Sequence, residues 1–189
     1  GRHVRCRSCV GPLWLHGFMK GQGSGSGPVG GSERITDLDE SSLLAALGDT
    51  AQVIRQDEVD QLLLVSEWAV SHPGLGATGV LDADEHPGAE GTPAVAAFTA
   101  EPLAVALKIS PRQAQSFIAE TLDLKHRLPR VWDQVIALMC PVWKARRIAR
   151  RTHHLPLAAM PYVDGEVNGA VMRIGIDHKI LILIRNCKS

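Results

Sequence analysis

Hydrophobic residues recur at helical spacing along most of this chain, and the polar residues between them mark expected helix ends. A first helix, capped by Asp37 or Asp39, is expected to stop at Gly48, because glycine often terminates helices. A second helix is expected from Asp49 to about Val70, before a loop rich in glycine and proline. We expect this second helix to be the most buried element, because its apolar positions cover a wide face. These positions are Val53, Ile54, Val59, Leu62, Leu63, Val65, Trp68 and Ala69.

The clearest helix start lies at Ser110. Serine at the N-cap, Pro111 at the first helical position and Gln113 at the third form the pattern of a capping box. A shorter helix from Thr99, as its cap, to Leu107 is expected just before it. Behind the box, one helical face gathers Ala114, Phe117, Ile118, Thr121 and Leu122.

Two prolines open the next helices. Pro129 begins a helix whose apolar residues are Val131, Trp132, Val135, Ile136 and Met139. Pro141 begins a helix that is expected to turn four residues inward, namely Val142, Ala145, Ile148 and Ala149. The short turn at Cys140 predicts that these two helices form an antiparallel hairpin, and a weaker helix follows to about Val167.

These elements predict an all-α fold, an irregular bundle of about six or seven short helices. Residues 1–32 are rich in glycine and serine and are expected to be disordered, with Met19 as a hypothetical true start. Residues 33–168 form the expected helical domain. Residues 169–189 are an atypical tail, where Ile180–Ile184 has strand character without a second strand to pair with.

Charge is distributed in blocks, although the whole chain is formally neutral. Residues 33–101 carry fourteen acidic groups against two arginines, whereas residues 102–155 carry ten basic groups against three acidic ones. Two interpretations stay open: the basic half faces an anionic partner, or it packs on the acidic half of the chain. In the second case the acidic residues would be Asp57, Glu58, Asp60 and Glu67.

The composition argues against several classes of protein. No apolar run reaches the roughly 18 to 20 residues needed to cross a bilayer, and four scattered cysteines favour a reducing, cytoplasmic setting over a disulfide framework. No nucleophile has a base partner at a readable spacing, and no phosphate-binding loop is present, so we predict no catalytic residue. Cys6 and Cys9 form a CxxC pair that lacks convincing further ligands, so no metal or cofactor is predicted.

Two features suggest contact with DNA. The spacing from Ala106 to Ile118 matches a helix-turn-helix, in which Arg112, Gln113 and Gln115 would face a groove; a plain helical hairpin is the alternative. The helix after Pro141 carries a basic run that can neutralise phosphates; a solvated face, or ion pairs with the acidic half, is the alternative. The candidate DNA-contacting residues are Arg112, Gln113, Gln115, Lys144, Arg147 and Arg151.

Other conspicuous residues are assigned to structure. Trp132 and Trp143 are expected to anchor the core rather than to stack on bases. His153 and His154 adjoin at a helix end, where a cation favours the helix dipole, and capping is the preferred interpretation over metal binding.

The segments LKISPRQAQSFIAETLDLKHRLPRVW and PVWKARRIARRTHHL resemble the domain-of-unknown-function 222 family. That family forms the N-terminal helical region of many actinobacterial HNH endonuclease proteins, and the resemblance covers roughly residues 38 to 168. It implies a noncatalytic, DNA-contacting accessory module; the alternative is a protein-interaction or structural module that binds no nucleic acid. The nuclease ligands have no counterpart here, and the family pattern is lost after Asn168, as expected of a truncation or frameshift. The missing nuclease domain would use a divalent metal.

Overall fold

The computed structural model describes residue 35 and residues 37–74 and 84–169. Contacts between residues divide the chain into two compact units, residues 1–45 and 46–189. The described residues form mostly helices, as predicted, and add a two-stranded hairpin that the sequence did not indicate. The expected disorder of residues 1–32, the CxxC pair and the atypical tail beyond Gly169 lie outside the described residues.

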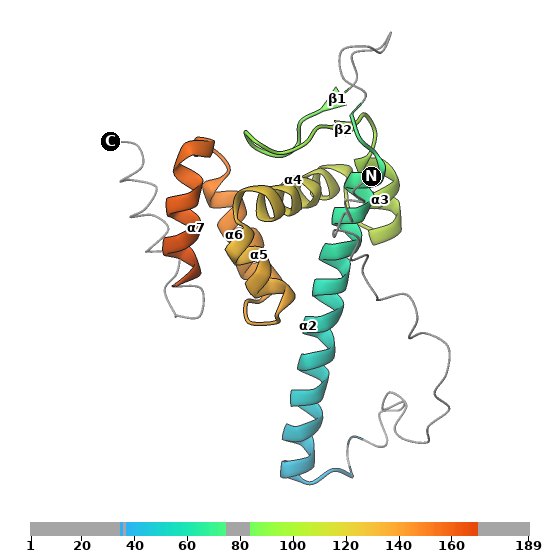
Figure 1. Cartoon of the computed structure of the whole chain (residues 1–189). Coiled ribbons are helices and arrows are strands. Elements are labelled where there is room, and N and C mark those ends of the chain that lie inside the picture. The colour runs from blue at the N-terminus through green and yellow to red at the C-terminus, as the bar shows by residue number, and fades with distance from the viewer. Residues whose placement is uncertain (1–34, 36, 75–83, 170–189) are drawn as a thin grey trace, which may run out of the picture. The chain divides into compact units, whose positions relative to one another are not determined.

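Nine elements follow one another along the described chain (Figure 1). They are α2 (Glu40–Ser71), β1 (Asp84–Glu85), β2 (Val95–Ala96), α3 (Ala100–Leu107), α4 (Pro111–Arg127), α5 (Pro129–Ile136), α6 (Val142–Thr152), the 3-10 helix η2 (Leu157–Ala159) and α7 (Met160–Asn168). The two strands pair antiparallel, with Asp84 opposite Ala96.

Helix α2 is one continuous helix of 32 residues, so the expected stop at Gly48 is wrong. Asp39 caps it, because the Ser42 backbone N–H donates to Asp39 Oδ1 at 2.8 Å. Hydrogen bonds from Ser42 and Ser41 hold the pKa of Asp39 below its usual value. A side chain at position 48 would meet nothing within 4 Å. Glycine there costs roughly 1 kcal/mol relative to alanine, which weakens a helix without ending it.

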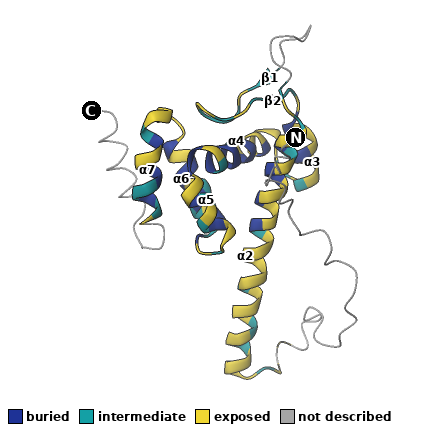
Figure 2. Cartoon of the chain, in the orientation of Figure 1, coloured by how far each residue is buried: buried dark blue, intermediate teal, exposed yellow. Residues whose placement is uncertain are grey.

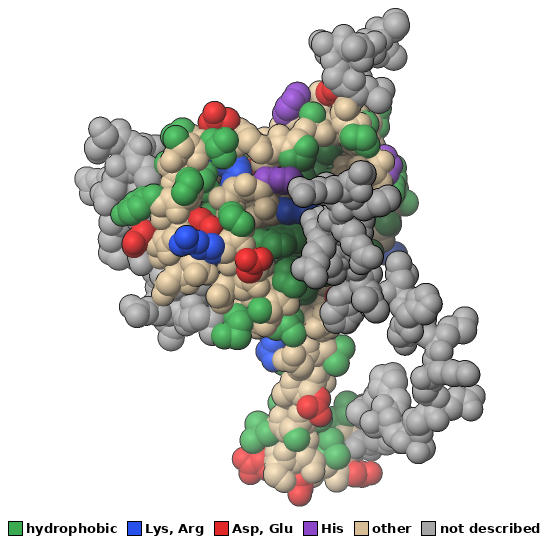
Figure 3. Space-filling view, in the orientation of Figure 1, with side chains coloured by type: hydrophobic (Ala, Val, Ile, Leu, Met, Phe, Trp, Pro, Cys, Tyr) green, Lys and Arg blue, Asp and Glu red, His purple; other side chains and the backbone are tan. Residues whose placement is uncertain are grey.

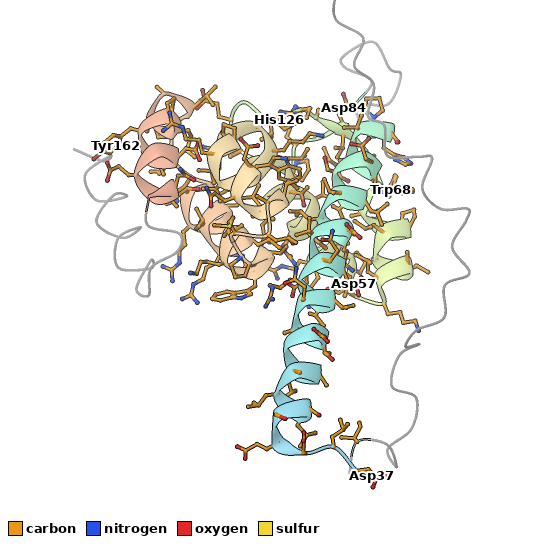
Figure 4. All side chains as sticks on the ribbon, turned by 60° about the horizontal axis from the view of Figure 1, so that its bottom comes forward. Asp37, Asp57, Trp68, Asp84, His126 and Tyr162 are labelled. Carbon is orange, nitrogen blue, oxygen red and sulfur yellow. The ribbon has the colours of Figure 1, made fainter. Side chains whose placement is uncertain are left out.

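Only the second half of α2 is packed, which corrects the expectation that this segment is the most buried element (Figure 2). Its buried residues are Val59, Leu62, Val65, Ser66 and Ala69. By contrast, Val53 and Ile54 are more than half exposed. Trp68, labelled in Figure 4, lies on this half of α2. Its Nε1 donates to the carbonyl of Thr99, the residue before α3, at 2.9 Å.

Helix α4 is the most buried helix instead, and it contacts α3, α5, α6 and α7. The predicted capping box is confirmed: Ser110 Oγ accepts from the Gln113 backbone N–H at 3.2 Å, and Gln113 Oε1 accepts from the Ser110 N–H at 3.0 Å. Thr99 is the N-cap residue of α3, as predicted, but its side chain makes no capping hydrogen bond, because its hydroxyl donates to the Ala96 carbonyl. Buried residues of α4 lie on nearly every side of the helix, so α4 forms the centre of the core.

The N-terminus of helix α5 is capped by a side chain of α7. Leu128 offers no side-chain cap, and the Asp164 carboxylate accepts from the backbone N–H groups of Arg130 at 3.0 Å and Val131 at 3.2 Å. Asp164 is buried, and this burial raises the pKa of its carboxyl group against the opposing effect of the two hydrogen bonds.

Replacing Asp164 by alanine should lower the free energy of unfolding by about 1–3 kcal/mol, because two N–H groups at the start of α5, one of them in a buried hydrogen bond, would lose their acceptor. Asp164→Asn should cost less, since the amide oxygen still accepts one bond and carries no charge to bury. Urea denaturation followed by circular dichroism measures both. Equal stability of wild type and Asp164→Ala would contradict the proposed cap.

Candidate nucleic-acid interface

Helix α6 has an apolar face and a basic face. Its apolar residues Val142, Ala145, Ile148 and Ala149 are all buried, as their spacing predicted. The other sides of the helix carry five basic residues within eight positions. These are Lys144, Arg146, Arg147, Arg150 and Arg151.

Glu120 of α4 binds two of these arginines. Arg146 Nε donates to Glu120 Oε2 at 2.6 Å, and Arg150 Nε donates to Glu120 Oε1 at 2.8 Å. Glu120 is only 4% exposed, and burying a carboxylate without such partners would be costly. The Arg146 guanidinium also lies 3.8 Å from the centroid of the Phe117 ring, in a cation–π contact. These contacts fix the rotation of α6 on α4.

Asp123, one turn further along α4, holds the end of α6. His153 Nδ1 lies 2.7 Å from Asp123 Oδ2, and the backbone N–H of Ala89 donates to Asp123 Oδ1 at 2.9 Å. The buried Arg127 lies 3.6 Å from Asp123 and donates to the carbonyl oxygens of His153 and Leu155. His153 does end α6, as predicted, and its ring also contacts a buried carboxylate that the sequence pattern did not indicate.

The arginines of α6 and the start of α4 line neighbouring depressions in the surface. One, of about 510 Å³, is lined by Trp143 and four arginines of α6. Two of these, Arg146 and Arg150, also line a depression of about 420 Å³ that includes Arg112. We call this continuous region the arginine surface. It comprises Arg112, Trp143, Arg146, Arg147, Arg150 and Arg151.

Three of the predicted DNA-contacting residues lie on the arginine surface. Arg112 is exposed at the start of α4, and Arg147 and Arg151 are exposed one turn apart on α6. Lys144 lies on α6 but is half-buried and lines neither depression.

The two predicted glutamines are engaged within the protein. The Gln113 side chain completes the capping box, and Gln115 Nε2 lies 3.4 Å from Glu85 Oε2. From Phe117 onward α4 is largely buried, so only its first two turns are accessible. The accessible part of α4 is therefore its N-terminal end, where Arg112 is exposed.

Sequence reasoning missed Glu120 and Asp123 as the residues that organise this surface. A signal was present, because both acids lie three residues apart among the apolar positions of α4. Charged residues in a helix that is buried on most of its faces need partners that are close to them in space. Their partners on α6 and at its end lie 26 to 30 residues later, so spacing along the chain does not identify them.

Trp143 is exposed, which corrects its assignment to the core. It is 58% exposed, whereas Trp132 packs against the core as expected. The reason is the helical register: Trp143 shares its side of α6 with Arg147 and Arg151, four and eight residues later.

The described part of the chain shows no group of three or more metal-ligating side chains. Burial raises the pKa of the Cys140 thiol to about 11, so it is protonated at neutral pH and a poor nucleophile. Within the described ranges, no helix is long and apolar enough to cross a membrane.

Glu120→Gln should lower the free energy of unfolding by about 1–3 kcal/mol, because both arginine contacts lose their charged acceptor. Glu101→Gln is the matched control, since Glu101 is exposed in the first turn of α3 and should change stability by less than about 1 kcal/mol. Denaturant titration of both variants measures the difference. Indistinguishable midpoints would show that Glu120 does not anchor α6.

The chain matches no family model, no curated protein and no solved structure. The likeness to the domain-of-unknown-function 222 family therefore rests on its quoted motifs, and function must be argued from the arginine surface itself.

Proposed function

We propose that this chain is a noncatalytic helical module that contacts nucleic acid through the arginine surface, as an accessory to a nuclease domain of the HNH type. The observation that carries the proposal is the gathering of five arginines from α4 and α6 around two adjoining depressions. The nuclease association comes from the family resemblance alone.

The charge balance of the surface favours an anionic ligand. Glu120 offsets one unit of charge while binding two arginines, so the surface stays positive after this pairing. The Arg150 side chain is still 66% exposed while it contacts Glu120, which leaves N–H groups available for a phosphate. Guanidinium groups bind phosphates through paired hydrogen bonds, and each neutralised phosphate releases counterions.

A second candidate function is protein association through α2. Figure 3 shows acidic and hydrophobic side chains together on this helix. Leu47 and Leu64 are each more than 60% exposed.

One contact between the basic and the acidic half of the chain is also present, because Lys125 Nζ lies 3.8 Å from Glu67 Oε1. Lys125 belongs to α4, so this contact leaves the arginine surface available.

Arg147→Glu with Arg151→Glu should abolish DNA binding of the whole chain at about 50 mM salt, because phosphates would then meet carboxylates. The single change Arg151→Ala should lower the slope of log K against log salt by about 1. Fluorescence anisotropy of a labelled oligonucleotide, titrated at several salt concentrations, measures both effects.

Arg55→Glu is the control for charge reversal outside the arginine surface, at an exposed arginine of α2 that bonds to Gln52. It should weaken binding far less. Wild-type chain that binds no nucleic acid at about 50 mM salt would refute the proposal. Self-association in sedimentation experiments, without such binding, would favour the second candidate.

A further inference from the structure

We infer that Trp143 is a stacking platform for an unpaired base, so that the arginine surface prefers single-stranded nucleic acid to duplex. This inference rests on the proposed function and specifies its ligand. It concerns one side of α6, where Trp143 is followed by Arg146, Arg147, Arg150 and Arg151.

The exposure of Trp143 distinguishes it from the other tryptophans in the described ranges. Trp68 donates its indole N–H to the Thr99 carbonyl, and Trp132 packs against the core. Trp143 is 58% exposed and lines a depression whose other walls are arginines. An exposed aromatic ring of this size gains free energy when a flat ligand stacks on it and covers its apolar face.

Helical geometry places phosphate-binding groups at a useful distance from this ring. Arg147 and Arg151 lie four and eight residues after Trp143, about 6 and 12 Å further along the helix axis. A base on the indole would therefore have its own and the next phosphate within reach of successive guanidinium groups. Aromatic stacking combined with a basic track is the usual way in which proteins bind single strands.

A duplex does not offer the same contact. Its bases stack on each other, so their faces are covered and only their edges are open in the grooves. The contacts of Arg146 and Arg150 with Glu120 also hold α6 against α4, which restricts how far it can enter a groove. An acidic peptide would satisfy the arginines but would bring no flat ring to Trp143.

The test uses the full chain and three probes of equal length: oligo(dT), oligo(U) and an oligo(dT)·oligo(dA) duplex. Trp143→Phe keeps an aromatic face, Trp143→Leu keeps apolar bulk without one, and Trp132→Phe is the matched control. Anisotropy gives Kd, and tryptophan fluorescence reports contact with the ring. Competition by polyglutamate tests for an acidic peptide as the true ligand.

We expect Trp143→Leu to weaken oligo(dT) binding about tenfold and Trp143→Phe to weaken it less, with duplex binding changed less than about twofold. Fluorescence quenching by oligo(dT) should saturate in the wild type and in Trp132→Phe and should be lost in Trp143→Phe. Oligo(U) that binds as tightly as oligo(dT) would indicate recognition of bases without regard to the sugar, and tighter binding of either would identify the preferred strand.

Unchanged binding of oligo(dT) by Trp143→Leu, or tighter binding of duplex than of single strand, would overturn the inference. If binding depends on salt but is unchanged by the substitutions of Trp143, only the base-stacking inference is refuted. The proposed function would still hold. Binding of no nucleic acid by the wild type, or its displacement by polyglutamate at equal charge concentration, would refute both.

Discussion

The arrangement of this protein depends on ionised groups buried within its central helix. Glu120, Asp123 and Arg127 lie on α4 where apolar residues surround them, and each charge has partners from other segments, although Arg127 Nε itself makes no hydrogen bond. Burial of a charge without a partner costs several kcal/mol, so only a packing that supplies every partner is stable. Rotating α6 by one residue would turn its arginines about 100° away from Glu120. The buried charges thus select the register in which the apolar face of α6 also fits the core.

The pairing of buried Glu120 with two arginines both stabilises the fold and orders the arginine surface. Arg146 and Arg150 serve the fold by neutralising Glu120, and in doing so they are held in place beside Arg147 and Arg151. A set of guanidinium groups that is already ordered loses less conformational entropy when a phosphate arrives. The surface therefore combines arginines that position the helix with the exposed residues Arg147 and Arg151.

Local sequence patterns predict much of this structure, but they do not identify interaction partners that lie far apart in the sequence. The Ser110 cap and the alternation of buried and basic residues along α6 follow from spacing within a few residues. The stop expected at Gly48 was wrong, because a preference of roughly 1 kcal/mol does not end a helix whose neighbours favour it. The core position predicted for Trp143 is wrong, because its helical register with Arg147 determines its exposure more than its hydrophobic character does. The pairing of Glu120 across 26 residues requires the fold itself.

The unequal packing of α2 has a consequence for motion. No residue from Glu40 to Glu58 is buried, whereas the segment from Val59 to Ala69 carries five buried residues. The first segment therefore depends on the Asp39 cap and on backbone hydrogen bonds, and exposed helical turns of this kind open and close independently of the core. Amide protons there should exchange with solvent well before those near Leu62. The helix would fray toward its middle while the α4–α6 contacts stay closed.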